Sequence, residues 1–243
     1  MADVAKHISG LKSEFIYFLQ EPSIKKDRVS GLPPKIQVLY ASKAKVMTRA
    51  AISASKNINL WLDNRHSTPD LAACVWLTGA RDKPKIYVAS VYLDINDKKV
   101  IPEELGNLVA ECSQKRIPLL LSIDSNSHST LWGSETNNLR GDRLEEFIAA
   151  NNMCIGNVGK APTFVSSRYS THIDLTLVRD VNISDWKVED VETQSDHKRI
   201  HFKLNLCKAP DVLKARNLND ADWAKFREQL ESRKIMVHDI WTV

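Results

Sequence analysis

Residues 118–133 read PLLLSIDSNSHSTLWG, and this stretch carries most of the information on the fold. Its first part, Pro118 to Ile123, is predominantly apolar and has the length of a short buried strand. Polar residues begin abruptly at Asp124 and continue through Asn126 and His128. A buried strand that ends in a polar cluster is typical of a layered α/β domain, in which strand-end loops carry the functional side chains.

Similar apolar runs lie on both sides of this stretch. Helices are predicted after Pro102, where Leu105, Leu108, Val109 and Cys112 form one apolar stripe, and over Asp142 to Ala150. Strands that alternate with a few helices predict an α/β sandwich with a mixed sheet. The predicted strands are Glu14 to Leu19, Ile36 to Ser42, Ala50 to Ser55, Leu71 to Leu77, Lys85 to Leu93, His172 to Val178 and Lys198 to Leu206.

The bulk composition describes an ordinary soluble globular chain. It has 243 residues, 43% of them hydrophobic and 26% charged, and a net charge of +4 that permits a polyanionic partner without requiring one. No apolar run reaches membrane length and the N-terminus has no signal-peptide core, so we expect no membrane association and a cytoplasmic or nuclear location. The cysteines lie in or near apolar runs without metal-ligand spacing, which predicts reduced, buried thiols. They are Cys74, Cys112, Cys154 and Cys207.

Four polar clusters stand at strand ends. Each one alone has a structural explanation, such as an Asx turn or a solvated strand end. Together they supply what hydrolysis of a phosphodiester requires: carboxylates for a divalent cation, a base, a carboxylate that orients the base, and donors to the phosphoryl oxygens. The clusters are Gln20-Glu21-Pro22, Asp124 to His128, His172-Ile173-Asp174 and Ser195-Asp196-His197.

These clusters and the segments between them resemble, in order, the motifs of endonuclease/exonuclease/phosphatase domains, and most closely the nuclease domains of non-LTR retrotransposons. The Leu-Trp-Gly segment at 131–133 favours the retrotransposon branch, because other relatives have different flanks. The resemblance implies a four-layer α/β sandwich of the deoxyribonuclease I-like type and an Mg²⁺- or Mn²⁺-dependent nuclease. The further matching segments are Asn138-Leu139-Arg140-Gly141, Ala161-Pro162-Thr163-Phe164 and HIDLTL at 172–177.

The resemblance also implies roles for individual residues. Glu21 ligates the metal ion, and Asp196 helps the metal or the histidine. Asp124 orients the attacking water or protonates the leaving oxygen, and Asn126 donates to the phosphate.

A hydrogen-bonded pair is implied for the last two motifs. Asp174 fixes the tautomer of His197, which is either the general base or a phosphate ligand. Tyr92 matches a position where a tyrosine contacts phosphate, and a buried core tyrosine is the equal alternative there. Trp132 is expected to pack in the core.

The family pattern begins with a strand that carries an asparagine, and the residues before Glu14 contain neither. We therefore expect the first strand to be missing and catalysis to be impaired. The catalytic domain is predicted over residues 1–208. Residues 209–243 are predicted as a linker with a short helix, Asp222 to Leu230, leading toward a reverse transcriptase.

Three functions from different classes compete. The first is a DNA endonuclease that nicks target DNA for target-primed reverse transcription. The second is a phosphatase of the same superfamily, which keeps the catalytic residues and changes the substrate. The third is a catalytically impaired DNA-binding remnant of a mobile element. Metal-dependent cutting separates the first from the third, and a phosphoinositide substrate separates the first from the second.

Overall fold

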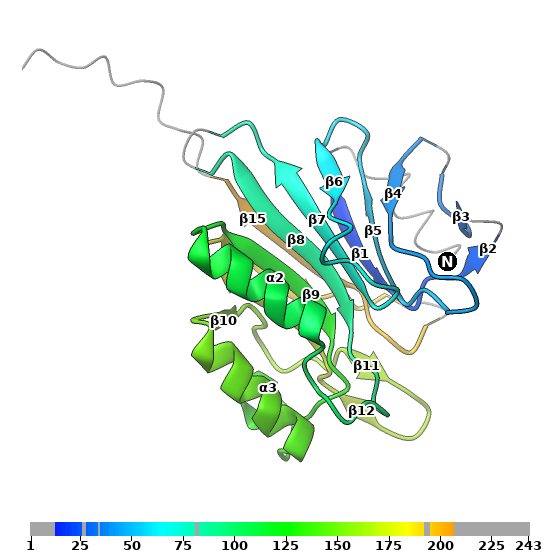
Figure 1. Ribbon diagram of the computed structural model, residues 1–243. Coiled ribbons are helices and arrows are strands. Elements are labelled where there is room, and N and C mark those ends of the chain that lie inside the picture. The colour runs from blue at the N-terminus through cyan, green and yellow to red at the C-terminus, as the bar shows by residue number, and fades with distance from the viewer. Residues whose placement is uncertain (1–12, 26–27, 34, 81–82, 192–194, 207–243) are drawn as a thin grey trace, which may run out of the picture. The chain divides into compact units, whose positions relative to one another are not determined.

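The computed structural model describes residues 13–25, 28–33, 35–80, 83–191 and 195–206 (Figure 1). The chain divides into two units, residues 1–207 and 208–243. The predicted linker and its helix at Asp222 to Leu230 lie outside the described residues, as do residues 1–12. The description that follows therefore concerns the first unit.

A six-stranded sheet forms the centre of this unit. Its order is β10 (Cys154–Ile155), β13 (Asp174–Arg179), β9 (Leu119–Asp124), β8 (Lys85–Tyr92), β7 (Leu71–Leu77) and β6 (Leu60–Leu62). Only β8 and β9 run parallel, and the other neighbours are antiparallel. The connection between β8 and β9 passes through α2 (Glu103–Gln114), as a parallel pair requires a crossover.

Helices α2 and α3 cover one face of the six-stranded sheet (Figure 1). Pro102 precedes α2 and Glu103 and Glu104 occupy its first turn, where the helix dipole favours acids. The helix α3 (Leu139–Ala150) begins after Asn138, whose side chain accepts a hydrogen bond from the Gly141 N–H. The helix therefore starts three residues before the amphipathic stretch predicted from Asp142, within the Asn138-Leu139-Arg140-Gly141 segment.

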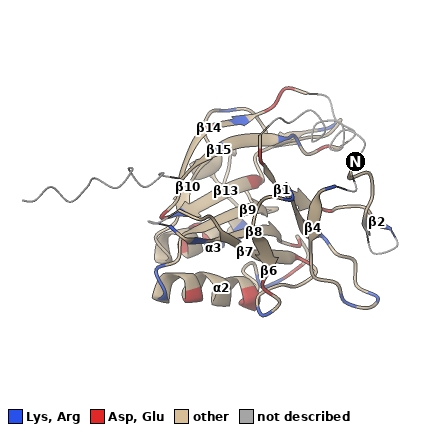
Figure 2. Cartoon of the chain, turned by 90° about the horizontal axis from the view of Figure 1, so that it is seen from above, with Lys and Arg blue, Asp and Glu red and all other residues tan. Residues whose placement is uncertain are grey.

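The other face of the large sheet packs on smaller sheets (Figure 2, seen from above). The strands β1 (Ile16–Gln20), β5 (Ala50–Ala54) and β4 (Gln37–Leu39) form a sheet in the order β1-β5-β4, and β14 (Asn182–Val188) pairs with β15 (Ile200–Asn205). The hairpin β2 (Ile24–Lys25) and β3 (Arg28–Val29) is separate, as is the hairpin β11 (Phe164–Val165) and β12 (Ser170–Thr171). A 3-10 turn spans Thr130–Trp132.

Side-chain alternation along the central strands produces two cores. In β8, Tyr87, Ala89 and Val91 face the helices, whereas Ile86 and Val88 face the smaller sheets. Both sets are buried, which explains why the sequence of this strand is apolar at consecutive positions from Ile86 to Ala89. The predicted α/β sandwich with a mixed sheet is confirmed.

Several finer predictions need correction. Cys154 is exposed, because it lies in the short outer strand β10, whereas Cys74 and Cys112 are buried as expected. The strand β14 was missed, because its burial alternates irregularly around a bulge between Ser184 and Lys187. Among the described residues, the helices are all too short or too polar to cross a bilayer.

Candidate active site

The ends of β8 and β9 and the start of β13 lie at the same level of the large sheet and bring polar side chains together. In the ladder, Asp124 at the end of β9 is paired with Tyr92 at the end of β8 and with Asp174 at the start of β13. Residues directly opposite each other on neighbouring strands point to the same face of a sheet. The register alone therefore places Tyr92, Asp124 and Asp174 side by side.

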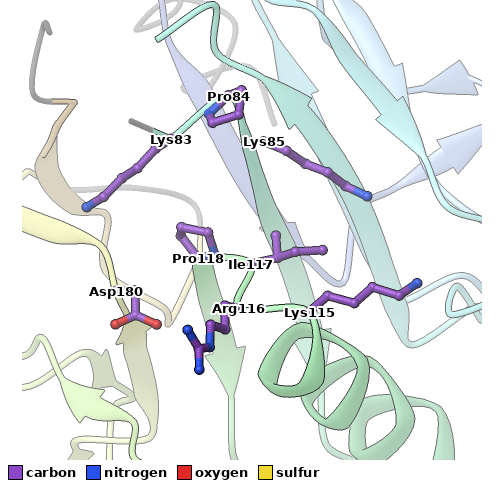
Figure 3. A pocket seen from close by; sticks show the side chains of 8 residues that line it. All are labelled: Lys83, Pro84, Lys85, Lys115, Arg116, Ile117, Pro118 and Asp180. Atoms are coloured by element: carbon purple, nitrogen blue, oxygen red, sulfur yellow. The ribbon is translucent and has the colours of Figure 1, made fainter. Parts of the chain in front are cut away.

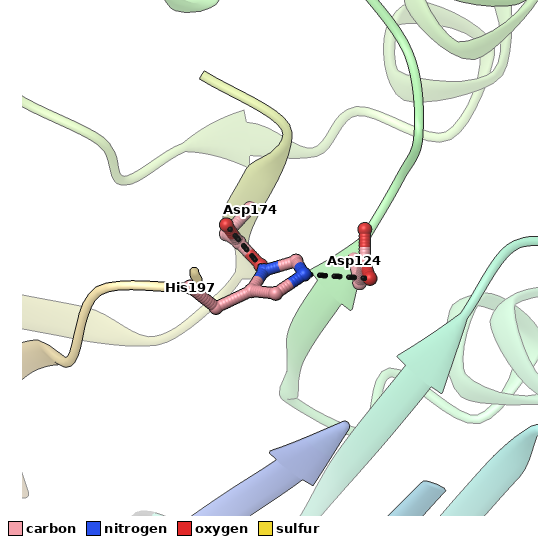
Figure 4. A group of neighbouring side chains, drawn as sticks. All are labelled: Asp124, Asp174 and His197. Carbon is pink, nitrogen blue, oxygen red and sulfur yellow. Dashed lines mark hydrogen bonds and ion pairs between the residues drawn. The ribbon is translucent and has the colours of Figure 1, made fainter. Parts of the chain in front are cut away.

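His197 completes this group from the loop before β15 (Figure 4). Its Nδ1 lies 2.9 Å from Asp174 Oδ1 and 3.1 Å from Asp174 Oδ2. Its Nε2 lies 3.7 Å from Asp124 Oδ2. With Nδ1 held by Asp174, the histidine presents Nε2 to the space beside Asp124, which is the atom free to meet a substrate.

The electrostatics of the group are dominated by burial and by like charges. Burial raises the pKa of Asp124, and the charge of Asp174 raises it further against the opposing charge of His197. Burial alone would lower the pKa of His197, but the hydrogen bond and charge of Asp174, with the charges of Asp124 and Glu21, raise it to about 9. Near neutral pH the imidazolium is therefore the resting form, held among carboxylates.

Glu21 reaches the same space from the three-stranded sheet. It follows β1 directly and adopts a left-handed backbone with φ of 47°, which is uncommon for a residue with a side chain. The preceding residue, Gln20, anchors this corner between the sheets. Its Nε2 donates to Ser90 Oγ at 3.0 Å and to the Ser122 carbonyl at 3.2 Å. The Gln-Glu pair of the sequence thus combines an anchor with an exposed carboxylate.

The loop after β9 is held in place by its own polar residues. Ser125 Oγ donates to the carbonyl of Ile173 at 2.7 Å, and Asn126 Nδ2 donates to the carbonyl of Leu93 at 3.1 Å. An asparagine amide has two N–H donors, so Asn126 keeps one for a ligand. Its backbone φ of 47° also lies in the left-handed region, where asparagine is tolerated.

A cavity of about 240 Å³ joins these residues. Its polar lining consists of Glu21, Tyr92, Asp124, Asn126, His128 and His197. The remaining lining is mostly apolar or aromatic, and comprises Ile95, Phe164, Tyr169, Thr171 and Ile173. Every predicted site residue except Asp174 and Asp196 therefore lines the cavity. Asp174 is connected to the cavity through its hydrogen bond with His197.

The aromatic side of the cavity was not predicted as part of the site. The Phe164 ring packs edge-on against His197 with centroids 4.9 Å apart, and Tyr169 stacks on Phe164 at 5.9 Å. Thr163 is buried, and its Oγ1 accepts a hydrogen bond from the Asp174 N–H at 3.0 Å. The Pro-Thr-Phe segment was the available signal, since Thr163 and Phe164 each support one member of the Asp174–His197 pair.

Asp196 lies outside the cavity, although the sequence suggested a role with the metal. Its side chain is exposed and its carbonyl accepts a hydrogen bond from the Val165 N–H at 2.8 Å. The adjacent residue His197 lines the cavity, whereas Asp196 lies at a bend of the chain and is exposed to solvent. Trp132 is buried in the helix-side core, as predicted.

The residues present fit a divalent cation. The carboxylates of Asp124 and Asp174 and a ring nitrogen of His197 lie within 4.8 Å of one another. Among the described residues, Asp124 Oδ1 is a buried oxygen without a hydrogen-bond partner. Because Asp174 and His197 already bind each other, the oxygen atoms left for a cation are those of Asp124 and Glu21. Carboxylate oxygens are the ligands that Mg²⁺ and Mn²⁺ prefer.

A second hollow lies at the opposite ends of β8 and β9 (Figure 3). It is larger, about 670 Å³, but its charged lining is Lys83, Lys85, Lys115 and Arg116 with the single acid Asp180. It contains no histidine and no pair of carboxylates. The smaller cavity, where acids and a histidine converge, is therefore the candidate active site.

Comparison with known proteins gives a consistent result. A family described as endonuclease-reverse transcriptase matches residues 86–201, a range that includes Tyr92, Asp124, Asp174 and His197. The Pol polyprotein of the type-1 retrotransposable element R1 from Bradysia coprophila is 26% identical over 185 residues, which is 68% of this chain. The chain spans 18% of that relative's length.

Solved structures agree on the fold. The endonuclease domain of TRAS1, a telomere-specific non-LTR retrotransposon, superposes with a TM-score of 0.71 at 24% identity, over 85% of this chain and 93% of that one. A mannosyl-6-phosphatase from Bacteroides thetaiotaomicron superposes with a TM-score of 0.55 at 16% identity, over 84% and 89% of the two chains.

Proposed function

Because the chain belongs to the endonuclease/exonuclease/phosphatase superfamily, in its non-LTR retrotransposon branch, we propose that it is a divalent-metal-dependent endonuclease that nicks DNA. The observation that carries the proposal is the Asp174–His197 pair, which faces the buried carboxylate of Asp124 in a small acidic cavity. A bound Mg²⁺ or Mn²⁺, held by Glu21 and Asp124, would neutralise charge on the phosphate and the leaving oxygen.

The side chains of the cavity have separate roles in activating the water and binding the phosphate. Asp124, whose carboxylate lies beside Nε2 of His197, is placed to orient the attacking water and to accept its proton. His197, which is protonated in its resting form, donates from Nε2 to a non-bridging phosphoryl oxygen, and Asp174 holds the ring in that orientation. Asn126 offers its second N–H to the same phosphate, and Tyr92 lies beside it.

The reaction is a hydrolysis. The water oxygen bonds to phosphorus while the bond from phosphorus to the 3′ oxygen breaks, which leaves a 5′-phosphate and, after protonation, a 3′-hydroxyl. Such a 3′-hydroxyl is a primer for reverse transcription. We therefore place this domain before a reverse transcriptase in a longer element protein that acts on DNA in the nucleus, with residues 209–243 as the connecting segment.

The proposal predicts that purified protein relaxes supercoiled plasmid to open circles in Mg²⁺ and that EDTA abolishes the reaction. Replacing His197 with alanine should slow nicking by about a hundredfold to a thousandfold, because the phosphate loses a positioned donor. His201→Ala is the matched control, since His201 lies in β15 and outside the cavity lining. Direct extension of the nick by a DNA polymerase reports the 3′-hydroxyl.

Two outcomes would count against the proposal. A folded protein that binds plasmid in EDTA but cuts nothing in Mg²⁺ or Mn²⁺ would identify a DNA-binding remnant. Release of phosphate from a sugar phosphate or a phosphoinositide, with plasmid left intact, would identify a phosphatase on the same fold.

A further inference from the structure

Arg49 stands at the start of β5 and makes an unusually complete set of contacts. Its Nε and Nη2 donate to the two carboxylate oxygens of Asp70, each at 2.7 Å, and its Nη1 donates to Asp94. The guanidinium carbon also lies 4.5 Å from the centroid of the Tyr92 ring. Three of the five guanidinium N–H donors of Arg49 are therefore held by carboxylates.

Main-chain hydrogen bonds also connect Arg49 and Asp70 to residues of the cavity. The Arg49 carbonyl accepts the N–H of Glu21 at 2.8 Å, and the Arg49 N–H donates to the carbonyl of Pro69 at 2.7 Å. The carbonyl of Asp70, in turn, accepts the N–H of Tyr92 at 2.9 Å. Glu21 and Tyr92 are thus each tied to the Arg49–Asp70 pair through a main-chain hydrogen bond.

Asp94 connects the Arg49–Asp70 pair to the rim of the cavity, and the three residues Arg49, Asp70 and Asp94 are called the Arg49 unit below. One carboxylate oxygen of Asp94 accepts a hydrogen bond from Arg49 Nη1, and the other accepts a hydrogen bond from the backbone N–H of Asn96 at 2.9 Å. The hydrogen bond from Asn96 closes a turn around Ile95, which lines the cavity and is 60% exposed to solvent. Glu21, Tyr92 and Ile95 form one wall of the cavity, and each is connected to Arg49.

The position of this unit has a consequence for the site. Glu21 belongs to the three-stranded sheet, whereas Tyr92 and Asp124 belong to the six-stranded sheet. The distance between the candidate metal carboxylates, Glu21 and Asp124, therefore depends on how the two sheets are held together at this edge. Arg49 before β5 and Asp70 before β7 form an ion pair across that junction.

We propose that Arg49, through Asp70 and Asp94, is a positioning residue that fixes Glu21 and Tyr92 relative to Asp124 across the junction of the two sheets. The inference rests on the proposed function for its catalytic consequence. Arginine is required because a planar guanidinium pairs with one carboxylate at two points, reaches a second one and still covers an aromatic ring, whereas lysine offers a single point charge.

The test uses Arg49→Lys, which keeps the charge and removes the two-point pairing. Binding of Mn²⁺ alone, measured by electron paramagnetic resonance, should weaken at least tenfold because Glu21 is no longer held. The kcat for nicking a DNA duplex should fall about a hundredfold, as expected for a misplacement near 1 Å. Arg65→Lys is the matched control, because Arg65 also pairs with one carboxylate at two points, that of Asp63, outside the cavity lining.

Amide hydrogen exchange gives a readout that does not depend on activity. Exchange at the backbone N–H groups of Glu21 and Tyr92 should accelerate in Arg49→Lys and stay unchanged in Arg65→Lys.

If Arg49→Lys does not fold, Asp94→Asn removes the charge that pairs with Arg49 Nη1 and should produce a smaller loss of Mn²⁺ affinity and kcat. Normal Mn²⁺ affinity and kcat in a folded Arg49→Lys, or unchanged exchange at Glu21 and Tyr92, would overturn the proposal. If the parent protein cuts no DNA, the proposed function fails, while the exchange measurements still decide the positioning.

Discussion

Asp174 and His197 form the hydrogen-bonded pair on which the proposed chemistry depends, and their interaction predicts a pH effect. With a pKa of about 9, His197 stays protonated up to that pH, so nicking should decline only above it. Asp174→Asn removes the negative charge that favours the imidazolium and leaves only a neutral amide oxygen as a hydrogen-bond acceptor. The decline should then move toward the ordinary histidine pKa of about 6.5. The variant should lose more activity at pH 8 than at pH 6.

Single-turnover nicking between pH 5.5 and 9.5 measures this shift. Asp180→Asn is the control, because Asp180 follows β13 at its opposite end, away from His197. Parallel pH profiles for the parent protein and Asp174→Asn would show that His197 does not act through its protonated form.

At the scale of elements, a buried polar network joins the segment after β6 to the helix α2. Asp63 accepts hydrogen bonds from the hydroxyl of Tyr87 at 2.7 Å and from Arg65, and it contacts Nδ1 of His66 at 3.1 Å. The Nε2 of His66 lies 3.4 Å from Glu111 in α2. Burial alone would raise the pKa of Asp63, but the hydrogen bonds from Arg65, Tyr87 and His66 hold it well below its usual range.

This network predicts a stability effect with a defined pH window. Asp63→Asn should lower the free energy of unfolding at pH 7 by roughly 2 kcal/mol, because buried donors lose a charged acceptor. A depressed folded pKa contributes stability that is present above the unfolded value of about 3.9 and is lost as the pH falls through the folded value. The difference between the parent protein and the variant should therefore narrow below about pH 4.

Urea unfolding at pH 7, 4 and 3 tests this window. Asp185→Asn is the comparison, because its ion pair with Lys203 is exposed and screened by solvent and should contribute little to stability at any of these pH values. A constant difference across the three pH values would contradict the assigned role of Asp63.

At the scale of the whole molecule, charge predicts how DNA is held. The net charge is only +4, and Figure 2 shows basic and acidic segments distributed over helices, strands and loops. We therefore expect few phosphate contacts. The logarithm of DNA affinity should fall with the logarithm of salt concentration with a slope between about −2 and −5. Binding of a DNA duplex in EDTA at 50–300 mM salt measures it, and an affinity indifferent to salt would contradict an electrostatic DNA site.

The sequence by itself determined the sandwich, most strand positions in the large sheet, and the identity of the polar clusters. It could do so because strands buried on both faces have apolar residues at consecutive positions, as in β8 and β9, and because clusters of polar residues begin where those strands end. The order of the motifs also predicted that Asp124, Asp174 and His197 belong to one site, although their roles stay predictions.

Only the tertiary structure decided which neighbouring residues face the cavity. Asp196 and His197 are adjacent in sequence, yet only His197 lines the cavity, where it contacts Asp174 and the Phe164 ring, whereas Asp196 is exposed. The Arg49 unit was equally invisible, because Arg49, Asp70 and Asp94 are separated along the chain and meet only where two sheets are packed together. Local patterns report burial and turns, whereas contacts between sheets depend on register and packing, which a single sequence does not encode locally.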